Sequence, residues 1–281
     1  MIHSAAPVAD ELIEMRGLRF HYRDWPSKRA EAPDLVLLHG YTGHARSWDA
    51  FAEAMTDRYR VLTLDQRGHG ETGWAPPDRY GVDDMADDLQ ALVVALDLRR
   101  FTLLGLSMGG MVAMEYAGRR PKELAACVIV DIGPEIVASG ATRIRAGARA
   151  NDIFLSRDEA FAAARALNSL PPEAHHRHRV DYSLMRTSDG SWTYRFDRAL
   201  RSPNTLRPRD PEAAWRSCAN MNVPTLLIRG GLSDILSSEV AERMIETIPD
   251  ARLALVANSG HAVPLDEPEG FLAAAREFLK G

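Results

Sequence analysis

The chain has 281 residues, of which 46% are hydrophobic and 26% charged, values that are typical of a soluble globular protein. This length fits one large α/β domain with an insertion, or two small domains. The net charge is -5 and no basic block occurs, so the sequence predicts neither a nucleic-acid partner nor binding to an anionic membrane.

Strand-like and helix-like segments alternate through most of the chain. Runs such as residues 35–38 are apolar throughout, which is typical of central strands that are buried on both faces of a parallel sheet. The order of elements predicts an α/β fold with a mostly parallel sheet and helices on both faces. Strands are predicted at residues 12–15, 18–22, 35–38, 60–65, 101–104, 124–130, 223–228 and 252–256. Helices are predicted at residues 47–55, 82–96, 110–117, 239–248 and 270–279.

Residues 135–217 interrupt this alternation. The segment is rich in Ala and Arg, has a helical pattern and contains no strong parallel strand. We predict that residues 135–217 form a helical insertion, and that residues 1–134 and 218–281 together form the core.

The cysteines and the N-terminal residues indicate the compartment. Cys127 and Cys218 lie far apart in the sequence and lack the spacing of metal ligands. Residues 1–15 contain no apolar region of the kind found in a signal peptide. No run reaches the roughly 18 apolar residues that a membrane span needs. We therefore expect a cytoplasmic protein.

Residues 105–109, Gly-Leu-Ser-Met-Gly, stand between an apolar strand and a helix with a buried face. A strand, a sharp turn and a helix form the context of a nucleophile elbow. The glycines two residues before and after Ser107 remove side chains that would clash where strand and helix meet. A glycine-rich turn with a solvated serine would show the same five residues, so Ser107 needs partners before it is interpreted as a nucleophile.

A second glycine pattern, Gly68-x-Gly70-x-x-Gly73, matches a dinucleotide-binding fingerprint. That fingerprint must open a helix, because the phosphates are bound at the helix N-terminus. Here the four residues 74–77, Trp-Ala-Pro-Pro, follow instead, and they cannot start a helix promptly. We therefore reject a dinucleotide site and expect no cofactor.

Polar residues gather at the ends of the predicted strands. In open parallel sheets the functional site lies outside the carboxyl ends of the strands. The candidate chemical residues at these ends are His39, Asp65, Ser107, Asp131, Asp234 and His261.

With these residues in place, the chain resembles the α/β-hydrolase family over its whole length except the insertion. The resemblance implies an eight-stranded sheet, Ser107 as nucleophile, His261 as general base and a lid made by the insertion. The chemistry supports these roles separately, since a serine hydroxyl needs an adjacent base at neutral pH. The motifs that carry the resemblance are residues 37–41 (Leu-Leu-His-Gly-Tyr), 65–70 (Asp-Gln-Arg-Gly-His-Gly), 105–110 (Gly-Leu-Ser-Met-Gly-Gly) and 259–261 (Ser-Gly-His).

The acid that would orient His261 has two candidates. In the family's usual Gly-x-x-Asp slot, counted from Gly230, this chain has Ser233, and Asp234 comes one residue late. Some family members take the acid from the end of the strand after the nucleophile helix, where this chain has Asp131. We favour Asp131 and keep Asp234 as the alternative. The carboxylate that is not used would cap a helix or hold a loop.

The oxyanion hole is expected to use the backbone N–H groups of Tyr41 and Met108. Met108 directly follows the nucleophile, and Tyr41 follows His39 and Gly40. We expect His39 to order its loop rather than to transfer protons. The family loop at residues 65–70 is expected to support the site.

The insertion is expected to select the substrate. One arginine that faces the pocket would suit a carboxylate-bearing substrate, because a guanidinium pairs bidentately with a carboxylate. A solvated helix face is the alternative for each arginine. The histidines within residues 175–178 lack metal-ligand spacing, so no metal site is expected. The candidate substrate-binding residues are Arg143, Arg145, Tyr182 and Trp192, and Arg179 and Arg186 are further arginines of the segment.

The predicted activity is that of a serine hydrolase acting on a small carboxylic ester, lactone or activated amide through an acyl-enzyme (EC 3.1.1). Carbon–carbon bond hydrolases and cofactor-free perhydrolases share these motifs and are the alternative, and a non-catalytic ligand-binding relative is a third hypothesis. Residues 130–134, together with Ser233, resemble bacterial catabolic hydrolases, one group of which opens acetamidomethylene-succinate. The expected partner is a small-molecule substrate, and the expected assembly is a monomer or homodimer.

Overall fold

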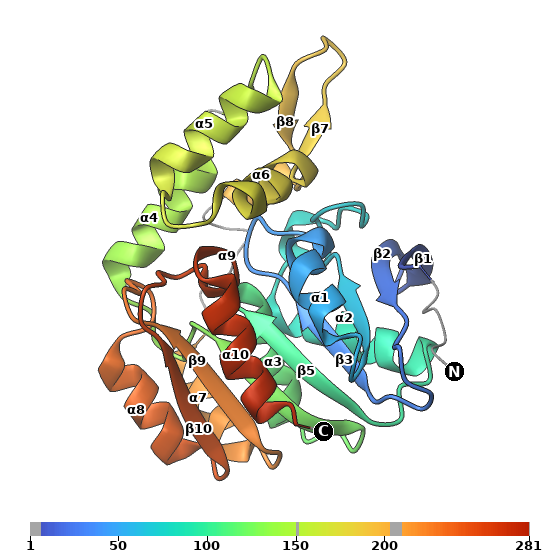
Figure 1. Cartoon of the computed structure of the whole chain (residues 1–281), viewed down its shortest axis with the longest axis vertical. Helices are drawn as coiled ribbons and strands as arrows, with labels where there is room; N and C mark the ends of the chain where they lie inside the picture. The colour runs from blue at the N-terminus through green and yellow to red at the C-terminus, as the bar shows by residue number, and fades with distance from the viewer. Residues whose placement is uncertain (1–6, 150–151, 203–209, 281) are drawn as a thin grey trace.

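A twisted sheet runs through the centre of the molecule (Figure 1). The computed structural model describes residues 7–149, 152–202 and 210–280. The strands of the sheet are β1 (Ala9–Met15), β2 (Leu18–Trp25), β3 (Asp34–Leu38), β4 (Arg60–Leu64), β5 (Phe101–Leu106), β6 (Leu124–Val130), β9 (Thr225–Gly230) and β10 (Ala251–Val256). Among the described residues they form one eight-stranded sheet in the order β1-β2-β4-β3-β5-β6-β9-β10.

Within the eight-stranded sheet of the described residues, the N-terminal hairpin departs from the parallel arrangement. β1 pairs antiparallel with β2, and β2 pairs antiparallel with β4. The pairs β3–β4, β3–β5, β5–β6, β6–β9 and β9–β10 are parallel. Because parallel strands share a direction, β3, β5, β6, β9 and β10 end at one edge of the sheet, where the loops of the site begin. The predicted mostly parallel sheet is confirmed.

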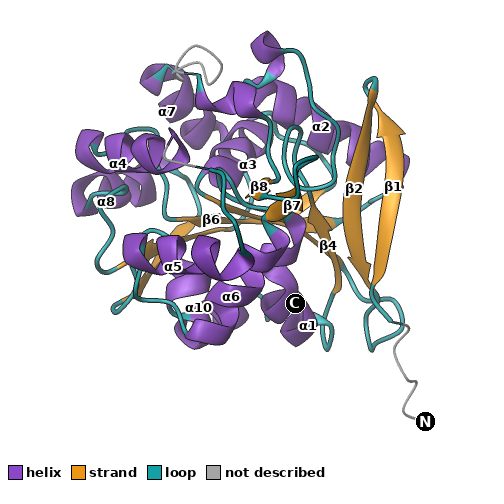
Figure 2. Ribbon diagram, turned by 90° about the horizontal axis from the view of Figure 1, so that it is seen from above, coloured by secondary structure: helices purple, strands orange, loops and turns teal. Residues whose placement is uncertain are grey.

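Helices cover both faces of the sheet, as Figure 2 shows from above. The helices of one face are α2 (Val82–Ala95), α3 (Met108–Gly118), α7 (Pro211–Asn220) and α8 (Ser238–Thr247), and those of the other are α1 (Asp49–Met55) and α10 (Pro268–Phe278). Along β3, Val36 and Leu38 pack in the first hydrophobic cluster, and Leu35 and Leu37 pack in the second. Successive side chains of a strand point to opposite faces, so a strand between two cores is apolar at every position.

The segment between β6 and α7 stands above this sheet in Figure 1. It contains α4 (Ala138–Arg149), α5 (Arg157–Leu167), α6 (Glu173–Tyr182), β7 (Leu184–Arg186), β8 (Trp192–Tyr194) and the 3₁₀ helix η3 (Arg198–Arg201). A small hydrophobic cluster of its own, which includes Phe154, Phe161 and Val180, holds α5, α6 and β7 together. The antiparallel hairpin β7–β8 was not predicted, because strands of three residues are too short to show an alternating pattern.

Two further features differ from the sequence-based expectation in detail. The predicted helix at residues 47–55 is a 3₁₀ helix, η1 (Ala45–Trp48), followed by α1. The predicted end of the insertion at residue 217 falls within α7, whose Ala214 and Cys218 pack in the first core cluster. The division into core and insertion itself stays a prediction. The remaining short helices are η2 (Pro77–Arg79) and α9 (Val263–Asp266). Within the described ranges, no helix is both long and apolar enough to cross a bilayer.

Candidate active site

Ser107 occupies the sharp turn between β5 and α3. Its backbone has φ 53° and ψ −114°, a conformation that costs energy for a residue with a side chain. A Cβ on Gly105 would lie 2.1 Å from the carbonyl oxygen of Gly109, and a Cβ on Gly109 would lie 2.4 Å from that of Leu38. Since backbone atoms cannot move aside easily, both positions require glycine. The turn leaves the Ser107 side chain in the wall of a cavity.

His261 connects Ser107 to a carboxylate. Its Nε2 lies 2.9 Å from Ser107 Oγ, and its Nδ1 lies 2.8 Å from Oδ2 of Asp131. Asp131 follows β6 and is fully buried, whereas His261 lies in the loop after β10. A carboxylate at Nδ1 fixes the proton on that nitrogen, which leaves Nε2 able to accept the serine proton. This arrangement can generate a nucleophilic serine oxygen next to the cavity.

The Asp131 carboxylate has two further hydrogen-bond donors. The backbone N–H of Gly230 donates to Oδ1 at 2.8 Å, and the hydroxyl of Ser233 donates to Oδ2, the oxygen that also faces His261. β6 and β9 are neighbouring parallel strands, so the loop after β9 reaches the residue that follows β6. In the sequence, Ser233 occupies the position where the family usually has its acid. The sequence did not predict that a serine at this position donates to the carboxylate that follows the neighbouring strand.

Asp234 points to a different partner. Its two carboxylate oxygens accept hydrogen bonds from Nε and Nη2 of Arg143 at 2.8 and 2.7 Å. Both side chains are about half exposed, and this ion pair holds the pKa of the Asp234 carboxyl below its usual range. The carboxylate within hydrogen-bond distance of His261 is therefore that of Asp131.

The backbone beside Ser107 matches the expected position of an oxyanion hole. Met108 begins α3, and the N–H of the first residue of a helix has no acceptor within that helix. On the other side, a Cβ on Gly40 would lie 3.3 Å from the Cβ of Ser107, so the loop that leads to Tyr41 passes next to the serine. The roles of the Met108 and Tyr41 N–H groups stay predictions.

His39 orders this loop by hydrogen bonds to the backbone. Its Nδ1 donates to the carbonyl oxygen of Gly40 at 2.8 Å, and its Nε2 accepts from the N–H of Gln66 at 3.0 Å. Burial lowers the pKa of His39 to about 4, so the ring is neutral at physiological pH. A neutral ring with both nitrogens occupied holds the loop in one conformation.

The cavity next to Ser107 and His261 has a volume of about 290 Å³. This volume is at the lower end of the range for small-molecule sites. Its core-side wall includes residues 39–43, Trp48 and Leu265. Its other wall comes from the segment between β6 and α7, with Arg143, Ala164, Leu167, Asn168, His176, Arg179, Ser183, Tyr194 and Phe196.

Of the predicted substrate-binding residues, Arg143 lines this cavity, whereas Tyr182 and Trp192 do not. Tyr182 is 44% exposed and lines a second cavity, where the guanidinium of Arg46 lies over its ring. Trp192 is covered instead by the guanidinium groups of two arginines. His176 of α6 faces the cavity, and Tyr182, six residues later on a helix with 3.6 residues per turn, lies on another face. The side chain of Arg145 lies outside the described part of α4.

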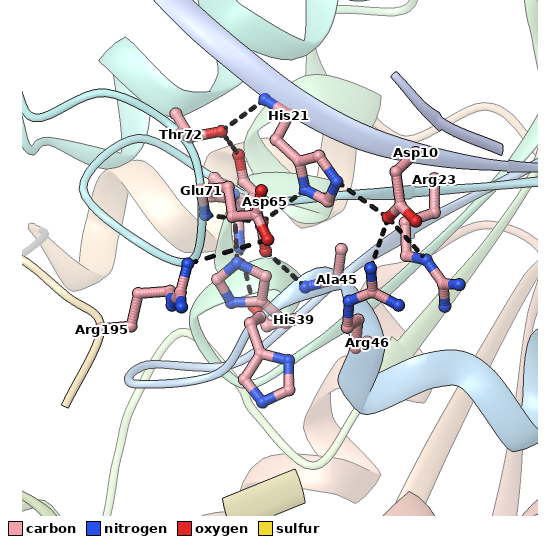
Figure 3. A network of polar contacts seen from close by, with 12 residues as sticks. Asp10, His21, Arg23, His39, Ala45, Arg46, Asp65, Glu71, Thr72 and Arg195 are labelled. Atoms are coloured by element: carbon pink, nitrogen blue, oxygen red, sulfur yellow. Dashed lines mark hydrogen bonds and ion pairs between the residues drawn. The ribbon is translucent and has the colours of Figure 1, made fainter. Parts of the chain in front are cut away.

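A buried polar network supports the loops beside the cavity (Figure 3). Asp65 accepts hydrogen bonds from the N–H groups of Ala45 and Glu71 at 2.6 and 2.9 Å, and its Oδ2 lies 2.7 Å from Nδ1 of His21. Burial alone would raise the pKa of the Asp65 carboxyl, but the hydrogen bond from His21 and the other donors lower it to about 2. The ionised carboxylate thereby ties the loop after β3 to the loop after β4.

Among residues 7–149, 152–202 and 210–280, no group of three or more His, Cys, Asp or Glu side chains is arranged to hold a metal ion. The histidines of α6 have separate surroundings. His176 packs edge-on against Phe161, whereas His178 contacts the backbone oxygen of Arg46 and the carboxylate of Asp49.

Comparisons with known proteins agree with this architecture. Residues 33–268 match the model of the alpha/beta hydrolase fold family. The 3-hydroxybutyrate-oligomer hydrolase of Cupriavidus necator is 28% identical over 96% of each chain. The sn-1-specific diacylglycerol lipase of Mus musculus is 30% identical and covers 89% of this chain and 82% of its own. Among solved structures, an E-2-(acetamidomethylene)succinate hydrolase superposes with a TM-score of 0.89 at 22% identity, covering 98% of this chain and 100% of its own.

The chain belongs to the alpha/beta hydrolase fold family, and the predicted family membership is confirmed. The two relatives described above carry the names of a hydrolase and a lipase, which supports an enzyme of hydrolase type. The likeness to the succinate-derivative hydrolase, at its low sequence identity, supports the fold alone.

Proposed function

We propose that this protein is a serine hydrolase that cleaves a small carboxylic ester, lactone or activated amide. The observation that carries the proposal is the continuous chain of contacts from Asp131 through His261 to Ser107, which ends in the wall of a small cavity. The relatives named as an oligomer hydrolase and a diacylglycerol lipase favour attack at an acyl carbon.

The proposed reaction has two half-reactions. Ser107 Oγ attacks the substrate carbonyl carbon while its proton passes to Nε2 of His261, and the Asp131 carboxylate stabilises the imidazolium that forms. The N–H groups of Tyr41 and Met108 would stabilise the oxyanion. The leaving group departs with the proton from His261 and leaves an acyl-enzyme. A water molecule then gives a proton to His261 and attacks the acyl carbon. The bond from that carbon to Ser107 Oγ breaks, His261 returns the proton to Oγ, and the acid is released.

The segment at residues 135–217 would act as the lid of this site. Side chains from α4, α5, α6 and β8 supply one wall of the cavity, so the segment determines which acyl or leaving groups fit. A cavity of about 290 Å³ favours small substrates over long acyl chains.

Turnover of 4-nitrophenyl acetate and butyrate tests the proposal. We expect Ser107→Ala to lower kcat by at least about 10,000-fold, because no other group can form the acyl-enzyme. Ser217→Ala, on α7 and away from the cavity, is the matched control and should keep the wild-type rate. Wild-type-like turnover by folded Ser107→Ala, or turnover of a dienone acid without any ester hydrolysis, would contradict an ester-hydrolase assignment.

A further inference from the structure

Two arginines line the cavity within the described part of the chain, and their surroundings differ. Arg143 is held by two hydrogen bonds to the Asp234 carboxylate. The guanidinium of Arg179 makes neither a hydrogen bond nor an ion pair with any described residue. The side chains of His44 and Ser183 donate hydrogen bonds to this residue at its backbone oxygen. Arg179 is thus the cation of the cavity wall that is available to a ligand.

The backbone of Arg179 is held in place by hydrogen bonds before any ligand binds. Its carbonyl oxygen accepts hydrogen bonds from Nε2 of His44 at 3.0 Å and from the hydroxyl of Ser183 at 2.8 Å. His44 belongs to the loop after β3, so its hydrogen bond attaches one turn of α6 directly to this loop of the core. A charged group on a rigid support loses less entropy when it binds an anion than one on a mobile loop.

Leaving Arg179 without an anion is unfavourable. The side chain is partly buried, and this burial lowers the pKa of the guanidinium, although nearby Tyr194 and Asp266 partly offset the effect. Arginine nevertheless stays protonated in proteins, so the charge remains. The Asp266 carboxylate makes no ion pair with Arg179 within the described residues, and it accepts hydrogen bonds from the N–H of Gly260 and from Asn168, at 2.9 and 2.7 Å. A bound anion would compensate the desolvated charge.

The groups near Arg179 in the wall are neutral donors. Burial raises the pKa of Tyr194, so its hydroxyl keeps its proton and can donate. Burial also lowers the pKa of His176 to about 4, which keeps that ring neutral. One cation with neutral neighbours suits a monoanion such as a carboxylate. A phosphate monoester, with a charge of about −1.5 to −2, would need further cations.

We propose that Arg179 binds a free carboxylate of the substrate, so that the preferred substrate is a small ester bearing a carboxylate in addition to its scissile bond. This inference rests on the proposed serine-hydrolase function. The planar guanidinium would pair with both carboxylate oxygens and thereby orient the scissile carbonyl toward Ser107.

The test uses 4-nitrophenyl monoesters of succinate, glutarate and adipate, each paired with a neutral ester in which a primary amide replaces the carboxylate. Uncatalysed hydrolysis is subtracted, since a neighbouring carboxylate accelerates it. We expect wild-type enzyme to prefer the carboxylate ester of at least one length by about 10-fold or more in kcat/KM, the effect of one charge-assisted hydrogen-bonded pair.

Arg179→Met should lower kcat/KM for that ester by about 10- to 100-fold and for its neutral partner by less than about threefold. Arg179→Lys keeps the charge but lacks the planar guanidinium that pairs with both carboxylate oxygens. It should retain an intermediate preference for the carboxylate ester. The matched control is Arg177→Met, on the same helix, where the guanidinium pairs with exposed Asp158 and lies outside the cavity wall. It should leave both esters unchanged.

The outcomes separate this inference from the hydrolase proposal. If neutral esters are cleaved through Ser107 but the wild type shows no carboxylate preference, or Arg179→Met lowers both esters equally, the carboxylate site is wrong and the hydrolase stands. If no ester is cleaved and Ser107 does not label with a fluorophosphonate, the hydrolase proposal itself fails. Should Arg179→Met not fold, competition by glutarate against a neutral ester decides: competition in wild type that weakens in Arg179→Lys supports the site, and its absence in wild type overturns it.

Discussion

Two histidines in the described part of the chain contact a carboxylate through Nδ1, and the comparison between them shows how the partner at Nε2 determines a role. His261 faces a carboxylate with Nδ1 and the Ser107 hydroxyl with Nε2, beside a cavity. His21, on β2, faces carboxylates with both nitrogens, Asp65 at 2.7 Å and Asp10 at 3.1 Å. Two carboxylates favour the form of the ring that carries both protons, whereas a ring between a carboxylate and a hydroxyl has one nitrogen that can accept the hydroxyl proton.

The charge balance of the two sites follows from this difference. Burial would lower the pKa of His21, but Asp65 and Asp10 raise it above its ordinary value. The surroundings of His21 therefore favour its protonated form, and its hydrogen bond to Asp65 joins β2 to the loops around that carboxylate (Figure 3). The same residue types thus serve structure in one place and, in our proposal, chemistry in the other.

The largest expected effect separates the two candidate acids. Asp131→Asn should lower kcat for ester hydrolysis by about 10,000-fold, because the amide no longer fixes the His261 tautomer or stabilises the imidazolium. Asp234→Asn should change kcat by less than about fivefold, since it removes only an exposed ion pair with Arg143. Steady-state kinetics on one neutral ester measures both. Near-wild-type activity of Asp131→Asn would show that the carboxylate beside His261 has no catalytic role, and the proposed difference between the His261 and His21 sites would then be wrong.

Replacing each histidine with glutamine tests the roles of His261 and His21 separately. His261→Gln should lower kcat by at least about 1,000-fold with little change in stability. His21→Gln should leave kcat of the folded enzyme close to wild type and lower the free energy of unfolding by about 1–3 kcal/mol at pH 6. Steady-state kinetics and urea unfolding measure kcat and the free energy of unfolding for each variant. Equal loss of activity in both variants would refute the assignment of separate roles.

The stability effect at His21 should also depend on pH. Because the folded-state pKa of His21 is raised above its ordinary value of 6.5, its contribution is fully present below that value. It is lost as the pH rises through the raised folded-state pKa. The difference in unfolding free energy between wild type and His21→Gln should therefore shrink between pH 6 and pH 9. A difference that stays constant or grows over this range would show that His21 is not a buried cation.

A smaller effect is expected at Ser233, which supports the Asp131 carboxylate. Ser233→Ala removes one donor from the oxygen that faces His261 and should lower kcat by about 10-fold, the effect of one hydrogen bond to a charged group. KM should change little, because Ser233 does not line the cavity. The neighbouring Asp234→Asn is the control. An unchanged kcat would mean that Gly230 and His261 position the carboxylate without help.

The features that could be predicted from the sequence are those fixed by short-range sterics. Gly105 is required because a Cβ there would overlap the backbone of Gly109, four residues along the chain, and the apolar run of β3 follows from burial on two faces. Both leave a direct pattern in the sequence.

The features that depend on contacts between distant elements could not be predicted in the same way. The hydrogen bond from Ser233 to Asp131 requires that β9 lie beside β6, although residues 131–224 separate the two strands in the sequence. Which arginine faces the cavity depends on the rotation of α6 about its axis, so Arg179 could not be distinguished from its neighbours. Tyr182 and Trp192 were placed by residue type alone, and packing turned both away from the cavity.

The most direct test of the central claim is covalent labelling with a fluorophosphonate, followed by peptide mapping. We predict one label per chain on Ser107, abolished in Ser107→Ala, strongly slowed in His261→Gln and unchanged in His21→Gln. Labelling at another residue, or an equal rate in His261→Gln and His21→Gln, would contradict the claim that His261 activates Ser107 while His21 holds the fold.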